Sequence, residues 1–274
     1  TNQPFLKWLK TNKNDFLTWE QVKHNICLLS ENLRESLSKG DRCVLLSENR
    51  PEWLIADLAI MNAGGVTVPL FTTYSEKDYE YIINDCKPKI CIISNEIQFK
   101  KIEKFIPNET KVISIEKFNQ NIECIETILD KNSNQEKIDI YNNYNNKIIR
   151  KDLACIIYTS GTTGPPKAVM LSHDNLAWTA DTAVRIVSQT ATDTSLSYLP
   201  LSYIAEQMFT LHAPITSGAR VYFAESIDKM PDNLKEVQPT VFFGVPRVWE
   251  KFHAGISAKL KLATGVKLKL VEFA

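Results

Sequence analysis

The sequence lacks any excess of charge of one sign and any long apolar run. Its 32 basic side chains balance 32 acidic ones, so no overall field favours nucleic acid or an anionic membrane. No uninterrupted apolar stretch approaches the roughly 20 residues that a bilayer-spanning helix needs, and residues 1–7 do not have the layout of a signal peptide. We therefore expect a cytoplasmic protein with no transmembrane segment and no nucleic-acid partner.

Closely paired cysteines are also absent. Several of the six cysteines lie inside apolar, strand-like runs, and no Cys-x-x-Cys pair occurs among Cys27, Cys43, Cys86, Cys91, Cys124 and Cys155. This distribution is typical of buried, reduced thiols in an intracellular protein. The sequence therefore predicts neither a disulfide framework nor a metal–thiolate site.

Segments with helical and strand periodicity alternate along the first part of the chain. Thr18 and Gln21 have the spacing of a capping box, and the helix that follows is expected to end at Gly40. Asn49 is expected to cap a second helix, with Trp53 packing inward. The further predicted elements are strand 42–47, helix 51–63, strand 65–69, helix 75–85, strand 89–93 and strand 111–115. Such alternation predicts an α/β fold of mainly parallel sheets flanked by helices.

Residues 130–150 interrupt this alternation. They are rich in Asn, Lys, Gln and Tyr and show little periodicity, which is typical of an exposed connection. We therefore predict two α/β subdomains, residues 1–150 and residues 151–274. Beyond residue 251, lysines alternate with apolar residues; they include Lys259, Lys261, Lys267 and Lys269. The solvated face of a packing helix is the expected explanation, and peripheral contact with a membrane is the alternative.

The pattern that most restricts function lies between Tyr158 and His173. Residues 153–158 form an apolar, β-branched run that predicts a buried strand, and this strand leads into a loop of small and hydroxylated residues. Gly161 and Gly164 allow successive N–H groups to converge on one anion. Hydroxyl donors come from Thr159, Ser160, Thr162 and Thr163, and a positive charge suited to phosphate oxygens comes from Lys167. The loop is therefore predicted to bind phosphate.

Two other types of loop have a similar composition. A Walker A loop requires Gly-Lys-Ser/Thr at the start of a helix, whereas Lys167 follows Pro166 and precedes Ala168. A plain turn between two strands is the alternative without function. Residues 168–171 are expected to form the return strand of a hairpin, and Ser172 is expected to cap a helix over 173–186, with His173 as a polar helix-start residue.

Residues 158–173 resemble the phosphate-loop signature of the adenylate-forming (AMP-binding) superfamily, and they look most like the long-chain fatty acyl-CoA synthetases of the bubblegum-type branch. Residues 195–207 and 242–251 resemble two further shared motifs. The resemblance implies the N-terminal domain portion of the adenylate-forming fold, with ATP, Mg²⁺ and coenzyme A as cofactors and a long-chain fatty acid as substrate. In that family picture Lys167 and the loop N–H groups hold the β- and γ-phosphates, and Thr159 helps to place the metal.

The other two motifs imply substrate contacts. Many family members have histidine near the substrate carboxylate at the position of Tyr203, and a tyrosine can donate one hydrogen bond there but carries no positive charge. The alternative is that Tyr203 and Glu206 are ordinary helix-start residues. Gly244, Val245 and Pro246 are implied to border the acyl path; a strand from Thr240 that packs tightly into a helix is the alternative explanation of that segment.

The family's later motifs for adenine, ribose and the C-terminal domain do not occur in these 274 residues. The resemblance therefore implies the AMP-binding portion of a long-chain fatty acid–CoA ligase that needs its C-terminal half, in cis or in trans, and has little activity alone. The open alternatives are a non-catalytic remnant or interaction module with the same fold, and an adenylate-forming enzyme for another carboxylic acid.

Overall fold

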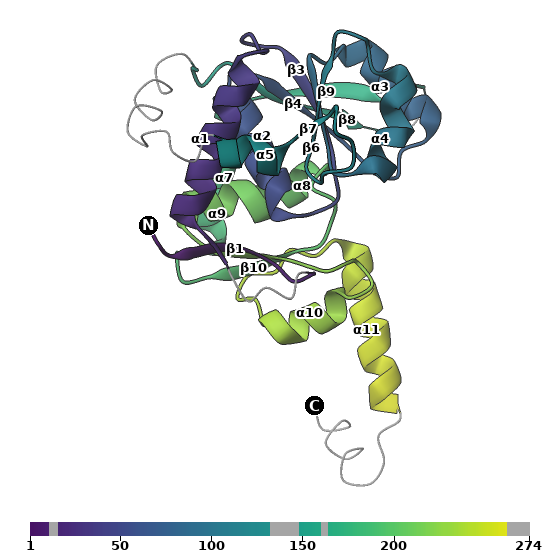
Figure 1. Ribbon diagram of the computed structural model, residues 1–274. Coiled ribbons are helices and arrows are strands. Elements are labelled where there is room, and N and C mark those ends of the chain that lie inside the picture. Colours follow the sequence, from purple (N-terminus) through teal and green to yellow (C-terminus); the bar gives the residue numbers. More distant parts are fainter. Residues whose placement is uncertain (11–15, 132–147, 160–163, 262–274) are drawn as a thin grey trace. The chain divides into compact units, whose positions relative to one another are not determined.

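The computed structural model describes residues 1–10, 16–131, 148–159 and 164–261. The chain forms two compact units, Thr1–Val241 and Phe242–Ala274. The first unit holds both β-sheets and most of the helices (Figure 1). The described part of the second, residues 242–261, contains one long helix.

The larger sheet of the first unit has seven strands in the order β7-β6-β5-β3-β4-β8-β9, and the smaller has four in the order β10-β11-β1-β2. Neighbouring strands are parallel except for the pairs β8/β9 and β1/β2. The strands are β1 Pro4–Trp8, β2 Leu17–Thr18, β3 Arg42–Leu46, β4 Val66–Leu70, β5 Ile90–Ile93, β6 Lys111–Ser114, β7 Glu123–Cys124, β8 Leu153–Thr159, β9 Lys167–Ser172, β10 Thr194–Ser197 and β11 Arg220–Phe223. The predicted mainly parallel sheets are confirmed.

Both sheets contain strands from before and after residue 150. The division predicted at that residue therefore does not coincide with a division between the sheets. Most of the connection predicted there, residues 132–147, lies outside the described residues.

Helices connect most of the parallel strands, because parallel neighbours need a long crossover connection. They are α1 Trp19–Arg34, α2 Pro51–Asn62, α3 Glu76–Cys86, α4 Glu96–Ile102, η1 Glu103–Phe105, α5 Ile125–Lys131, α7 His173–Val187, α8 Ile204–Gln207, the π-helical turn η2 Met208–His212, α9 Ala213–Ser217, α10 Met230–Val237 and α11 Pro246–Lys261. None of the helices in the described ranges is long and apolar enough to cross a membrane.

Capping boxes fix the starts of three of these helices. Thr18 and Gln21 form the predicted box at α1, and Ser172 forms the predicted cap of α7 with Asn175 as its partner. In each box the side-chain oxygen accepts from a backbone N–H that has no partner within the helix. The predicted end of α1 at Gly40 is wrong, because the helix stops at Arg34 and a short turn follows.

The prediction that Asn49 caps α2 is also wrong. The N-cap residue is Arg50, whose side chain makes no capping bond, and Pro51 begins the helix. Trp53 is fully buried, as predicted. The side chain of Asn49 is directed to a segment 150 residues further along the chain, with consequences for the site described below.

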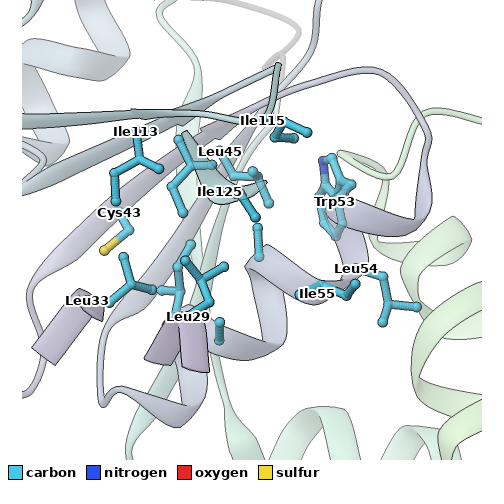
Figure 2. Packing of buried hydrophobic residues seen from close by; sticks show 14 of the residues in the cluster. Leu29, Leu33, Cys43, Leu45, Trp53, Leu54, Ile55, Ile113, Ile115 and Ile125 are labelled. Carbon is cyan, nitrogen blue, oxygen red and sulfur yellow. The ribbon is translucent and has the colours of Figure 1, made fainter. Parts of the chain in front are cut away.

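The hydrophobic core lies on both faces of the seven-stranded sheet. On one face, Leu29 and Leu33 of α1 and Trp53 of α2 pack with Leu45 of β3 (Figure 2). On the other face, Val44 of the same strand packs with residues of α3. Every residue of β3 after Arg42 is buried, which is typical of a parallel strand covered by helices on both sides. All six cysteines are free and buried, as predicted.

One carboxylate lies inside this core without a partner. Asp57 of α2 is 1% exposed, and neither of its oxygens has a hydrogen-bond partner among the described residues. Burial raises the pKa of Asp57 to about 7. The side chain of Thr67 opposes this rise in pKa, although its hydroxyl is not in hydrogen-bonding geometry with the carboxylate. The Asp57 carboxyl group is therefore more readily protonated in the folded protein than in the unfolded chain.

The strand predicted from Thr240 is reduced to an isolated bridge between Ser195 and Val241, so this prediction is wrong in extent.

In the second unit, α11 begins at the predicted Pro246. The indole N–H of Trp249 donates to the carbonyl oxygen of Gly244 over 2.8 Å, and a Cβ at residue 244 would lie 2.8 Å from the indole nitrogen. A side chain at that position would therefore displace the Trp249 ring, which explains the glycine.

Candidate functional site

The predicted phosphate loop connects β8 to β9. The two strands form an antiparallel hairpin in which Thr159 is paired with Lys167. The predicted loop residues Ser160, Gly161, Thr162 and Thr163 lie outside the described residues. Gly164 has φ +95°, and no atom lies within 4 Å of where its Cβ would be. The glycine is therefore required by its backbone conformation and not by crowding.

Both ends of this loop lie at the carboxyl edge of the larger sheet. Strand β8 runs parallel to β4, with Cys155 opposite Thr67, so Thr159 comes level with Phe71, the first residue after β4. Ligands of open α/β sheets bind outside the carboxyl ends of the parallel strands. The hairpin is therefore in a suitable position for a ligand.

The charged group of the hairpin is available to a ligand. Lys167 is exposed and makes no ion pair with any residue in the described ranges. Thr159 is also exposed, and its hydroxyl lies 3.5 Å from the carbonyl oxygen of Lys167, which is the limit for a hydrogen bond. One ammonium group and one hydroxyl therefore face solvent beside the loop, a set that suits the oxygens of a phosphate chain.

The strand that carries the loop is fixed by two tyrosines. The hydroxyl of Tyr158, the last buried residue of β8, donates to Asp85 over 2.5 Å, and burial raises the pKa of Tyr158, with a further contribution from this bond. The hydroxyl of Tyr74 donates to the carbonyl oxygen of Tyr158 over 3.0 Å. The peptide immediately before Thr159 is therefore held in place from the loop that follows β4.

An aromatic cluster connects this anchor to Tyr203. The ring of Phe71 lies edge-on to the rings of Tyr74, at 5.1 Å between centroids, and Tyr203, at 4.6 Å. Tyr79 supports the cluster from α3, since its hydroxyl donates to the carbonyl oxygen of Phe71 over 2.8 Å. Burial raises the pKa of Tyr74 to about 12. Tyr203 and the phosphate-loop hairpin, which are 31 residues or more apart in sequence, are thus brought to one edge of the sheet.

The turn before Tyr203 is attached to the ends of β3 and β4. The amide N–H of Leu201 donates to the side-chain oxygen of Asn49 over 2.9 Å, and the side-chain amide of Asn49 donates to Ser197 and to the carbonyl oxygen of Leu199. The hydroxyl of Ser202 donates to the carbonyl oxygen of Leu70 over 2.8 Å. These bonds explain why Asn49 does not cap its own helix. They also place a turn of the smaller sheet against the larger one.

Sequence analysis did not assign a role to the buried side chain of Glu206. It is 1% exposed and accepts hydrogen bonds from Ser197, Tyr198 and Thr210. Burial raises the pKa of Glu206 to about 7, and the hydrogen bonds partly oppose that rise. The only sequence signal was a glutamate among apolar residues three positions after Tyr203, and this pattern does not distinguish a buried acceptor from an exposed helix-start residue.

Two cavities of the first unit are lined by described residues other than Thr159, Gly164 and Lys167. One of about 590 Å³ lies among Phe5, Trp19 and Leu58. Another of about 500 Å³ includes His173 and His212. Burial lowers the pKa of His173. Burial also lowers the pKa of His212, to about 4, and the charge of His173 contributes a smaller part of that decrease. His173 begins α7, as predicted, and lies in this cavity away from the loop.

The predicted metal position has few ligands of its own. No group of three or more His, Cys, Asp or Glu side chains suited to a metal occurs among the described residues. Thr159 supplies one exposed hydroxyl. This donor set fits a Mg²⁺ ion that takes most of its oxygens from nucleotide phosphates and water, which is the usual way proteins hold this ion. The predicted acyl-path residues Gly244, Val245 and Pro246 belong to the second unit.

A protein-family model described as "AMP-binding enzyme" matches residues 2–271. The chain is similar to a long-chain-fatty-acid–CoA ligase, ACSBG2, of Gallus gallus, with 35% identity over 253 residues that cover 84% of this chain and 32% of the relative. It is similar to ACSBG2 of Homo sapiens, with 36% identity over 246 residues that cover 84% of this chain and 36% of the relative. The chain thus spans about a third of the length of these relatives.

The fold is similar to the crystal structure of ATP-bound MatB from Rhodopseudomonas palustris. The TM-score is 0.74 and the sequence identity is 24%, with coverage of 91% of this chain and 48% of that chain. A structural likeness at this level of sequence identity shows a shared fold and not a shared function. It agrees with the α/β architecture of parallel sheets flanked by helices that the sequence predicts.

Proposed function

Because the chain belongs to the AMP-binding enzyme family, we propose that it carries the triphosphate-binding part of a ligase that joins a long-chain fatty acid to coenzyme A at the expense of ATP. The observation that carries this proposal is the β8–β9 hairpin, which presents Thr159 and Lys167 at the carboxyl edge of the larger sheet with Tyr203 beside it. The fatty-acid class is supported by the names of the relatives.

The reaction has two displacements. A carboxylate oxygen of the acid attacks the α-phosphorus of ATP, and pyrophosphate leaves. The thiol sulfur of coenzyme A then attacks the acyl carbonyl carbon, loses its proton, and displaces AMP. Both steps build negative charge on oxygen, so fixed positive charge and hydrogen-bond donors lower their barriers.

The residues take the following roles in this proposal. Lys167, with the N–H groups and hydroxyls of residues 160–164, binds the β- and γ-phosphates. Thr159 offers one oxygen to Mg²⁺, which when bound neutralises phosphate charge. Tyr203 orients the substrate carboxylate through its hydroxyl, and Gly244, Val245 and Pro246 border the acyl path. ATP binding is also supported by the nucleotide bound to the similarly folded MatB.

A cytoplasmic location is part of the same proposal. Six buried free thiols suit a reducing compartment. The lysines of α11 and the segment after it leave peripheral contact with a membrane as the alternative. Neither interpretation changes the roles proposed for the hairpin and Tyr203.

Pyrophosphate exchange tests the proposal. Labelled pyrophosphate, ATP, Mg²⁺ and palmitate are incubated with residues 1–274 alone. They are also incubated with two longer forms: the polypeptide with any residues encoded beyond position 274, and residues 1–274 fused to the unmatched remainder of the Gallus gallus relative. We expect exchange only in the longer forms. Exchange in none of them would favour a remnant or interaction module, and exchange restricted to acetate or aryl acids would favour another carboxylic acid.

Tyr203→Phe tests the proposed carboxylate contact in the longer form. The substitution removes one hydroxyl and keeps the ring packed against Phe71. Loss of a single hydrogen bond to a charged carboxylate corresponds to about 1.5 kcal/mol, so we expect kcat/KM for palmitate to fall roughly tenfold. The KM for ATP should stay within about twofold. An equal fall for ATP and palmitate would argue against a specific contact between Tyr203 and the acid.

A further inference from the structure

The most completely buried hydrogen-bonded carboxyl group of this region belongs to Glu206, on the short helix α8. One of its oxygens accepts from the hydroxyl of Ser197 over 2.8 Å, from the amide N–H of Tyr198 over 3.2 Å and from the hydroxyl of Thr210 over 2.8 Å. A buried carboxyl group is costly unless several donors satisfy it. Here the three donors come from the end of β10 and from the π-helical turn η2.

This group is part of a longer network. The hydroxyl of Ser197, which donates to Glu206, also accepts from the side-chain amide of Asn49 over 3.1 Å. Asn49 in turn accepts from the amide N–H of Leu201. The network therefore joins three places: the end of β3, the end of β10 and the interior of the helix that starts after Tyr203.

The network encloses the turn that carries Tyr203. Of the residues between Tyr198 and Ser202, all but Pro200 are buried, whereas Tyr203 is 52% exposed. The amide N–H of Tyr203 donates to the carbonyl oxygen of Pro200 over 2.9 Å, and its carbonyl oxygen accepts from the amide of Gln207. The backbone on both sides of Tyr203 is therefore fixed, and its ring alone projects toward Phe71 and solvent.

We propose that Glu206 is a positioning residue: with Ser197, Thr210 and Asn49 it holds the turn over 198–203 so that the ring of Tyr203 lies at the carboxyl edge of the larger sheet, beside the phosphate-loop hairpin. Its role in turnover rests on the proposed function, because the group it positions is the proposed contact to the substrate carboxylate. The π-helical turn has a role in this arrangement, since it brings Thr210 back to the carboxyl group; such turns are frequent at functional sites.

Two threonines of the chain provide a matched comparison. Thr210 donates to Glu206 over 2.8 Å, and Thr110 donates over the same distance to the carbonyl oxygen of Pro88, at the opposite edge of the larger sheet. Both side chains are buried. Thr210→Val and Thr110→Val therefore each remove one buried hydroxyl hydrogen bond of the same length, one inside the network and the other far from it. Glu206→Gln keeps the side-chain volume and weakens the charge-assisted bonds.

Hydrogen–deuterium exchange of the unliganded protein is measured first, because it does not depend on activity. We expect Thr210→Val and Glu206→Gln to increase exchange of the amides of residues 198–203 at least fivefold, and Thr110→Val to leave them unchanged. If the wild type fails to use palmitate, the proposed function fails. The exchange measurement still tests the positioning role of Glu206, because it does not require activity. Unchanged exchange in both network variants would overturn the proposal.

Kinetics on the longer form then ask whether the network acts through Tyr203. We expect Thr210→Val to lower kcat/KM for palmitate about tenfold with the KM for ATP unchanged, and Thr110→Val to change neither. In a Tyr203→Phe background, the added loss from Thr210→Val should fall below about twofold, because the positioned hydroxyl is already gone. A full tenfold loss in that background would contradict positioning of Tyr203, whatever the thermal stability of the variants.

Discussion

Replacing Lys167 with alanine is expected to abolish pyrophosphate exchange in the longer form of the protein, with a loss of at least about 100-fold. Lys167 is an exposed cation at the loop end of the hairpin. It forms an ion pair with no described side chain, so its charge is available to phosphate. Removal of one preorganised donor from developing charge on oxygen typically costs about 10²–10³ in rate. Exchange is measured at saturating ATP, Mg²⁺ and palmitate.

Lys151→Ala is the matched control. Lys151 is also exposed and lies just before the opposite end of β8, away from the loop. We expect full exchange in this variant and an unchanged thermal midpoint in both, because neither lysine packs in the core. Lys167→Arg keeps a positive charge with a different shape and should recover part of the activity. Wild-type exchange in Lys167→Ala would rule out the proposed contact between Lys167 and the triphosphate.

Asp57→Asn is expected to stabilise the folded protein at pH 8 by about 2 kcal/mol. Burial raises the pKa of Asp57 from 3.8 to about 7, so the native state binds more protons than the unfolded chain between these values. The free energy of unfolding therefore falls as pH rises from about 4 to about 7 and stays low above that range. A shift of about three pKa units corresponds to at most about 4 kcal/mol, and the buried amide left without partners offsets part of the gain.

Urea unfolding of residues 1–274 between pH 4 and pH 9 measures this effect. Asp57→Asn should flatten part of the decline between pH 4 and pH 7 and should be less stable than the wild type by about 2 kcal/mol near pH 4, where the carboxyl group of the folded protein is already protonated and only the cost of the unpaired amide remains. Glu206, whose pKa burial also raises to about 7, contributes a remaining slope of the same sign. Asp228→Asn, at an exposed aspartate, serves as the control and should change nothing. Equal pH profiles for all three proteins would contradict an unpaired buried carboxyl group.

Local interactions explain where sequence analysis succeeded. The capping boxes at Thr18 and Ser172 and the apolar runs of β3, β5 and β8 depend on residues within a few positions of each other, and they are found as predicted. The hairpin return after the phosphate loop is also local. Its register follows from two adjacent strands joined by a short loop.

The wrong predictions concern residues whose partners lie far away in sequence. Asn49 has the composition and position of a helix cap, but three hydrogen bonds to residues 197–201 determine its orientation instead. The strand predicted from Thr240 has suitable β-propensity, yet it makes only a single bridge to β10. For Asn49, these tertiary contacts override the local preference.

The sequence by itself determined the α/β class, the parallel sheets, the hairpin that bears Thr159 and Lys167, and the family resemblance, because periodicity, capping and loop chemistry are written in consecutive residues. Only the tertiary structure decided that Phe71 and Tyr74 link Tyr203 to the end of β8, that Glu206 is a buried acceptor, and that Asp57 is a buried acid without a partner. These properties depend on which groups the fold places around each side chain. Such groups come from strands and turns up to about 150 residues apart, and no local pattern specifies them.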